Sequence, residues 1–158
     1  MIYSKNLFSF LLFFLMTVCS FAQKDIMSDR EAVHQVIITM FDGMREGDSA
    51  KVSSVFRKDV RMFTAYKKVT GESVLHEGKF SNFLKAIGTA HDEIWDERIS
   101  NTTIQIDGDI AQVWTDYSFY VGERFSHCGV DAFQLVKKNS KWRIINLMDT
   151  RRKDDCTK

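Results

Sequence analysis

The sequence predicts an α+β domain in which helices pack on one face of an antiparallel sheet. Apolar residues recur at a helical spacing between residues 28 and 56, whereas from Trp95 onward apolar and polar residues alternate with a period of two. Three turn motifs then separate the alternating segments: Asp107-Gly108, Gly122-Glu123 and Asn139-Ser140. Helices followed by strands that tight turns connect are typical of this two-layer architecture.

The first predicted helix begins at Ser28. Ser28 and Glu31 form a capping box, in which each side chain accepts a hydrogen bond from the backbone N–H of the other residue. The apolar residues that follow form one stripe at helical period: Ala32, Val33, Val36, Ile37, Met40, Phe41 and Met44. Gly47 is expected to end this helix, and Asp48 to cap a shorter second helix that continues to residue 56. The two helices should form an N-terminal helical hairpin.

The remaining elements follow from apolar spacing and from turns. Residues 60–66 predict a strand, with its turn near Thr70-Gly71. A third helix is expected over residues 80–87 and ends near Gly88, because four apolar residues there share one helical face. The turn motifs then delimit the strands of the meander, over residues 110–120, 125–137 and 142–150.

The first 22 residues differ in composition from the rest of the chain. Lys5 precedes an apolar run over residues 7–18, and small residues flank Phe21 in the spacing that a signal peptidase accepts. The run is shorter than the ~20 residues that a membrane-spanning helix needs, so an uncleaved anchor is disfavoured, as is a lipoprotein attached through Cys19. The prediction is a cleaved signal peptide at 1–22, one domain at 23–152, a loose tail at 153–158, and a periplasmic or secreted protein without membrane association after cleavage.

Charge and cysteine content narrow the class of protein further. With 22 basic and 21 acidic residues, the 158-residue chain lacks the basic excess of a nucleic-acid binder, so no nucleic-acid partner is expected. Removing residues 1–22 leaves 136 residues that retain Cys128 and Cys156. An oxidising compartment allows one disulfide between them. If the last hairpin is centred on Asn139-Ser140, Cys128 lies opposite residue 151. A disulfide with Cys156 then requires the tail to fold back, so free cysteines are favoured.

The turns predict which side chains share a face of the sheet. A hairpin centred on Gly122-Glu123 pairs Ser118 with His127, and one centred on Asn139-Ser140 pairs Asp131 with Met148. On this register one face combines aromatic rings, two carboxylates and a histidine: Trp114, Asp116, Ser118, Tyr120, His127, Asp131, Phe133, Asn146 and Met148. Such a mixture is typical of a lined cavity. A bulge in any of these strands would break the assignment.

This face suggests a binding or catalytic site. Asp116 would lie diagonally from His127, where its carboxylate raises the proton affinity of the imidazole and fixes its tautomer. Asp131 would be a second carboxylate, kept near neutral by an apolar wall. His127, Asp116 and Asp131 are thus the candidate catalytic residues, and the expected ligand contacts are Trp114, Ser118, Tyr120, Phe133, Asn146 and Met148. The simpler interpretation, a partly wet face with solvated charges, stays open and is favoured by the weakness of lone His and Asp signals.

No metal site and no organic cofactor are expected. Asp116, His127 and Asp131 could in principle bind a metal ion, but no closely spaced His or Cys pair accompanies them. His127 and Cys128 are adjacent in a strand, so their side chains point to opposite faces and cannot form a nucleophile–base pair.

The order of elements and several segments carry a resemblance to a known superfamily. The segments are Phe125–Val136, Trp142–Ile145, Asp149–Arg152, Ile106–Ala111 and Val113-Trp114. They resemble the NTF2-like superfamily, and within it the SnoaL-like branch with its lumazine-binding members, over residues 29–152. The resemblance implies a cone-shaped fold with a deep pocket between the helices and the concave sheet face, and often a homodimer built on the other face. Ketosteroid-isomerase-like members have a carboxylate base where this chain has Thr64.

Three functions stay open at this point. The preferred one is an exported NTF2-like domain that binds a small, partly aromatic or polar molecule without converting it. The second is a SnoaL-type isomerase, dehydratase or hydrolase in which His127 acts as a base oriented by Asp116. The third is a homodimeric interaction module whose cone is filled by its own side chains. The superfamily fold alone cannot choose among them, because it hosts many functions.

Overall fold

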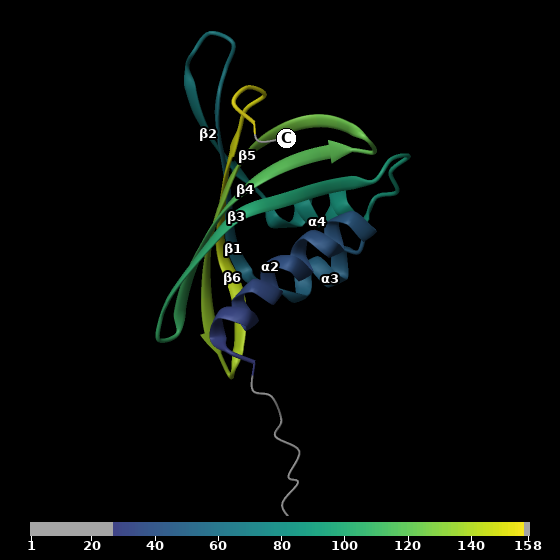
Figure 1. Ribbon diagram of the computed structural model, residues 1–158. Coiled ribbons are helices and arrows are strands. Elements are labelled where there is room, and N and C mark those ends of the chain that lie inside the picture. The colour runs from purple at the N-terminus through teal and green to yellow at the C-terminus, as the bar shows by residue number, and fades with distance from the viewer. Residues whose placement is uncertain (1–26, 157–158) are drawn as a thin grey trace, which may run out of the picture.

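A computed structural model describes residues 27–156 and shows three helices on one side of a curved sheet (Figure 1). The helices are α2 (Asp29–Glu46), α3 (Ser49–Ser54) and α4 (Phe80–Gly88). The strands are β1 (Phe56–Lys67), β2 (Ser73–Gly78), β3 (Trp95–Asp107), β4 (Ile110–Val121), β5 (Arg124–Lys138) and β6 (Lys141–Arg151). The α+β prediction is confirmed. The predicted signal peptide, residues 1–22, lies outside the described residues.

The six strands form a single open sheet in the order β2-β1-β6-β5-β4-β3. Neighbouring strands are antiparallel except β1 and β6, which run parallel. This exception places the strand that follows the helical hairpin next to the last strand of the meander. As a result, residues from both ends of the domain meet on the concave face of the sheet.

Helix α2 has the ends that its sequence predicts. The Ser28 Oγ accepts from the Glu31 N–H at 3.3 Å, and the Glu31 carboxylate accepts from the Ser28 N–H at 2.9 Å. Gly47 ends the helix with φ 68°, a left-handed conformation that glycine adopts without steric cost. No helix within residues 27–156 combines the length and the apolarity needed to cross a bilayer.

The apolar stripe of α2 covers one half of the concave face. Val113, Phe133 and Leu147 stand side by side on β4, β5 and β6 and are buried beneath the helix. The Phe41 ring meets the Phe133 ring edge-on, with 6.2 Å between centroids. Phe133, expected as a ligand contact, is therefore a core residue with 1% exposure. The other half of the concave face is left uncovered by this core.

The register predicted for the last three strands is confirmed next to the turns, where Tyr120 pairs with Phe125, and is wrong by one residue beyond a bulge in β5 and a bulge in β6. In β5 an extra residue, Ser126, lies between the pairs Phe119–His127 and Tyr120–Phe125. In β6 a second extra residue lies between the partners of Gln134 and Leu135. A bulge adds one residue to one strand only, and because side chains alternate, a one-residue shift moves a side chain to the opposite face.

The two bulges separate the residues that were expected to share one face. His127, Asp131 and Phe133 lie on the concave side with Val113, Thr115 and Tyr117. The other predicted site residues lie on the convex side: Trp114, Asp116, Ser118, Tyr120, Asn146 and Met148. Six of the nine predicted residues are thus on the face that points away from the helices.

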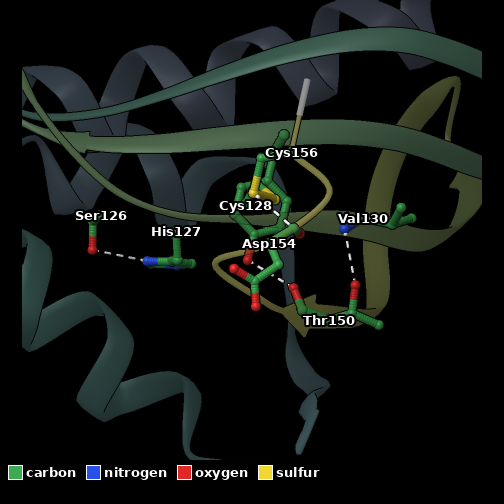
Figure 2. Close-up of a disulfide and its surroundings, with 8 residues drawn as sticks. Ser126, His127, Cys128, Val130, Thr150, Asp154 and Cys156 are labelled. Carbon is green, nitrogen blue, oxygen red and sulfur yellow. Dashed lines mark hydrogen bonds between the residues drawn. A yellow bond between two sulfur atoms is a disulfide. The ribbon is translucent and has the colours of Figure 1, made fainter. Parts of the chain in front are cut away.

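The C-terminal tail is anchored, which corrects two expectations. Cys128 and Cys156 form a disulfide with 5.8 Å between their Cα atoms (Figure 2). The backbone of Cys128 also exchanges two hydrogen bonds with Arg152, both 2.9 Å. The tail folds back here because this short bridge continues the β5–β6 pairing past the end of β6, and Asp155 then turns the chain with φ 53°. The cysteines are paired and the tail is not loose as far as Cys156.

Candidate functional site

An open cavity of about 1280 Å³ lies between the uncovered half of the concave face and helices α2 and α4. Met40 and Met44 of α2 and Phe83 of α4 line its helical side. All six strands contribute residues to the sheet side. The cone is thus not filled by its own side chains, and the space is sufficient for a small organic molecule.

Four rings form an aromatic wall on the sheet side: Trp95, Tyr117, Phe119 and His127. Strand pairing produces this wall, because Phe119 of β4 stands beside His127 of β5. The ring centroids of Trp95 and Phe119 are 6.1 Å apart, those of Phe119 and His127 5.0 Å, and those of Tyr117 and His127 5.7 Å. Rings at these separations present both faces and edges to a bound aromatic group.

A pair of carboxyl groups lies at the inner end of the cavity. Glu97 of β3 and Asp131 of β5 are hydrogen-bonded to each other across β4. Burial raises the pKa of Glu97 to about 7. Burial, followed by the negative charge of Glu97, raises the pKa of Asp131 well above its ordinary value. The pair therefore holds at least one proton at neutral pH.

One oxygen of this pair has no hydrogen-bond donor from outside the pair. Asp131 is only 3% exposed, and apart from the carboxyl group of Glu97 its Oδ2 has no hydrogen-bond partner in the described part of the chain. Leaving a buried acceptor unpaired costs about 1–3 kcal/mol. Since Asp131 lines the cavity, a bound molecule with an N–H or O–H group could supply the missing donor.

A third carboxylate, Asp149, lies beside Asp131 on β6. Its charge is neutralised locally, because Thr64 Oγ1 donates to one oxygen at 2.6 Å and Arg151 Nε to the other at 2.9 Å. Thr64, which replaces the carboxylate of ketosteroid-isomerase-like members, thus supports Asp149. Although Glu97, Asp131 and Asp149 all line this cavity, residues 27–156 contain no group of three His, Cys, Asp or Glu side chains arranged to hold a metal ion.

His127 is in the cavity but not with the partner that the sequence predicted. The Ser126 Oγ lies 3.0 Å from its Nδ1 (Figure 2). Burial, followed by the positive charge of Arg151, lowers the pKa of His127 to about 4, so the ring is neutral at pH 7. Asp116 instead accepts from Asn101 Nδ2 at 2.9 Å on the convex side. The Ser126 bulge is the reason that the predicted pair does not form.

The convex-side residues lie away from the cavity. Trp114 is 56% exposed there, and Tyr120 lies under the Arg98 guanidinium, with 4.2 Å from Cζ to the ring centroid. Of the predicted site residues, the structure therefore brings only His127 and Asp131 to the cavity.

Sequence reasoning missed four polar residues of the site: Glu97, Tyr117, Asp149 and Arg151. The predicted register places Tyr117 on the face opposite to His127, whereas the bulge in β5 brings both residues to the concave side. The sequence of β6 does contain a signal for two of these residues. Leu147, Asp149 and Arg151 occupy alternate positions, so their side chains share one face of the sheet, and the apolar Leu147 indicates that this face is turned toward the core.

The carboxyl pair predicts how stability depends on pH. In the unfolded chain Glu97 and Asp131 ionise near their ordinary pKa values of 4.5 and 3.8, whereas the folded pair keeps its protons to about pH 7 and above. The folded state then binds more protons, so stability is lost as pH rises through the folded pKa values. The free energy of unfolding should fall by about 2 kcal/mol between pH 6.5 and 8.5.

Urea denaturation at a series of pH values measures this effect. The lowered pKa of His127 acts with the opposite sign, mainly between pH 4 and 6.5, and contributes only about 0.4 kcal/mol above pH 6.5. The double variant Glu97→Gln/Asp131→Asn should remove the slope, while Asp116→Asn on the convex side should keep it. A wild-type slope that persists in the double variant would contradict the prediction.

Comparison with known proteins agrees with this geometry. A family model described as "Putative lumazine-binding" matches residues 28–148. None of the curated proteins matches the chain. Solved structures do: an NTF2-like protein of unknown function from Shewanella baltica OS155 is 18% identical, with a TM-score of 0.61 over 78% of this chain and 93% of that one.

Two proteins from Novosphingobium aromaticivorans have similar folds. An NTF2-like protein with a cystatin-like fold is 12% identical, with a TM-score of 0.64 over 80% of this chain and 84% of that one. A protein described as "Putative Scytalone Dehydratase" is 14% identical, with a TM-score of 0.61 over 78% of this chain and 83% of that one. At these identities the similarity shows the fold alone. With the family match covering most of the chain, this protein belongs to the family described as "Putative lumazine-binding", and its fold is similar to that of NTF2-like proteins.

Proposed function

We propose that the chain is an exported domain that binds a small, partly aromatic molecule in the cavity of its cone. The observation that carries the proposal is the Oδ2 of buried Asp131, which receives no hydrogen bond from outside the Glu97–Asp131 pair and lies in a cavity with an aromatic wall. A buried acceptor without a hydrogen-bond donor lowers the stability of the fold, and an N–H or O–H group of a ligand would supply the donor. The family description supports a ligand-binding role.

The walls indicate how such a ligand would lie. A ring of the ligand would stack on the rings of Trp95 and Phe119 or meet them edge-on. Each such aromatic contact contributes about 0.5–1.5 kcal/mol to the binding free energy beyond the contribution of the buried area. Its inner end would donate an N–H or O–H to Asp131. The neutral His127 ring, with one nitrogen near Ser126, would offer a second hydrogen-bonding atom to the ligand.

Native mass spectrometry of protein purified from its own host tests this proposal. We expect excess mass from a co-purified small molecule in the wild type, and its loss in Ala86→Phe, because Ala86 lines the cavity and a phenyl ring there occupies the ligand's space. Ala50→Phe, on the exposed side of α3, is the matched control and should keep the molecule. A wild type without excess mass, or a molecule retained equally by Ala86→Phe, would overturn constitutive binding in the cavity.

Export is supported by the disulfide. Cys128 and Cys156 are paired, and such bonds persist in oxidising compartments but are rare in the cytosol. We expect the mature chain to begin after residue 22, at Gln23, and the same mass spectrum reports this directly. A full-length chain in that spectrum would contradict cleavage.

A homodimer built on the convex face is supported by the apolar side chains exposed there. Trp114 and Met148 are 56% and 41% exposed and both lie on that side of the sheet. Exposed large apolar groups on one sheet face are typical of interaction surfaces. The native mass spectrum would then show a mass of two chains, and a monomer at micromolar concentration would contradict this part of the proposal.

A second candidate function, acid–base catalysis, is favoured by the Glu97–Asp131 pair. A carboxyl pair that titrates near neutral pH can both give and take a proton, as an isomerase, dehydratase or hydrolase requires. The base would be this pair and not the His127–Asp116 pair that the sequence predicted. If the co-purified molecule is converted by the wild type, Asp131→Asn should abolish turnover while the molecule still binds; a pure binder would show only a change of affinity.

A further inference from the structure

Six cations line the same cavity, and we call them the basic rim: Lys67, Lys68, Lys79, Arg151, Arg152 and Lys153. All six are exposed to solvent, whereas Asp131 at the inner end is buried. They come from three places in the fold, the end of β1, the residue before α4, and the end of β6 with the segment that follows it. Residues far apart in sequence thus bring like charges to one opening.

Most of the basic rim has no counter-ion on the protein. Lys68 pairs with Glu72 at 2.9 Å, and Arg151 with Asp149 at 2.9 Å. The other four cations make no ion pair with any residue between 27 and 156: Lys67, Lys79, Arg152 and Lys153. Asp154 is the carboxylate that lines the cavity beside them. The opening therefore carries a net positive charge.

The inner end of the cavity has the opposite character. Glu97 and Asp131 are two acidic groups in contact, and Asp149 lies beside them. An anionic group of a ligand would be repelled there and would lose its hydration. At the basic rim the same group would stay partly hydrated and would face uncompensated cations.

We propose that the ligand is an amphipathic anion, whose ring enters the cavity toward Glu97 and Asp131 and whose carboxylate, sulfonate or phosphate group lies against the basic rim. This inference rests on the proposed binding function and adds the charge and the orientation of the ligand. The Cys128–Cys156 disulfide (Figure 2) contributes to this arrangement. Together with two backbone hydrogen bonds between Cys128 and Arg152, it holds the segment that follows β6 beside β5.

Two fluorescent probes that differ by one charge test the proposal. 8-Anilinonaphthalene-1-sulfonate and N-phenyl-1-naphthylamine share their rings and their N–H group, and only the first carries a sulfonate. In the double variant Lys67→Gln/Lys153→Gln, the affinity of the sulfonate probe should fall about fivefold, as expected for two exposed ion pairs. The affinity of the uncharged probe should change less than about twofold, and added salt should weaken only the sulfonate probe.

Two further variants separate the possible failures. Lys138→Gln/Lys141→Gln removes the same charge at the β5–β6 turn, away from the cavity, and should leave both probes unchanged. Equal effects of the two double variants on the sulfonate probe would overturn the anionic ligand while leaving the cavity as a binding site. If Ala86→Phe excludes neither probe, or neither binds the wild type, the proposed binding function itself fails.

Discussion

Replacing Gly129 by alanine is expected to lower the free energy of unfolding by more than about 3 kcal/mol. Gly129 lies in the middle of β5, two residues before Asp131. A Cβ atom at this position would overlap the carbonyl oxygen of Thr150 and lie 2.7 Å from Cε1 of the Tyr117 ring. The first of these atoms belongs to the backbone, so no change of side-chain rotamer relieves the overlap.

The Thr150 carbonyl is held over Gly129 by its own hydrogen bonds. It accepts from the Tyr117 hydroxyl at 2.8 Å, and the Thr150 Oγ1 accepts from the Val130 N–H at 3.1 Å (Figure 2). Moving the carbonyl away would break the first bond and displace Asp149 and Arg151, which flank Thr150 in the chain. The variant should therefore be less stable than the wild type, and the part of the cavity wall formed by Asp149 and Arg151 should be displaced.

Urea denaturation measures this loss, and Gly78→Ala is its matched control. Gly78 is also in a strand, but a Cβ there would lie 4.0 Å from the Met62 Cβ, an ordinary contact. The control should change the free energy of unfolding by less than about 1 kcal/mol. Equal stabilities of the two variants would show that the close approach of Thr150 to Gly129 is not required by the fold.

Removing the disulfide should have an effect of similar size. In Cys156→Ser the free energy of unfolding is expected to fall by about 3–4 kcal/mol, because the bond closes a loop of 28 residues and restricts the unfolded chain. The variant should also release the segment with Arg152 and Lys153, which the disulfide and two backbone hydrogen bonds hold beside Cys128.

Chemical denaturation with and without dithiothreitol separates the disulfide from other effects of the substitution. Reductant should destabilise the wild type to the level of Cys156→Ser and should leave the variant unchanged. Limited proteolysis should then cut after Arg151, Arg152 or Lys153 in the reduced wild type and in the reduced Cys156→Ser variant. A wild type whose denaturation midpoint does not respond to complete reduction would contradict the proposed contribution of the bond.

The helices and the long strands could be predicted because their signals are local. The capping box at Ser28, the stripe of α2 and the turns at Gly108 and Gly122 each involve residues within a few positions of one another. β2 is the exception, since its six residues are mostly exposed and lack a clear alternation. It forms because β1 offers a free edge for pairing.

The candidate site could be predicted only in part. His127 and Asp131 reach the cavity because both belong to β5 and their positions differ by four, so their side chains lie on the same face. Asp116 and Trp114 do not, because a single extra residue at Ser126 reverses the face of β4 relative to β5. Nothing in the local sequence around Ser126 distinguishes a bulge from regular pairing.

By itself the sequence determined the α+β class and the positions of the helices and most strands, since these rest on periodicity, caps and turns. Its segments also match the family described as "Putative lumazine-binding". Only the tertiary structure decided which side chains meet. The Glu97–Asp131 pair joins β3 and β5, the Cys128–Cys156 bond needs the tail to turn back, and the parallel pairing of β1 with β6 brings Thr64 to Asp149. Each of these contacts depends on strand register and chain reversal over many residues, which no local pattern encodes.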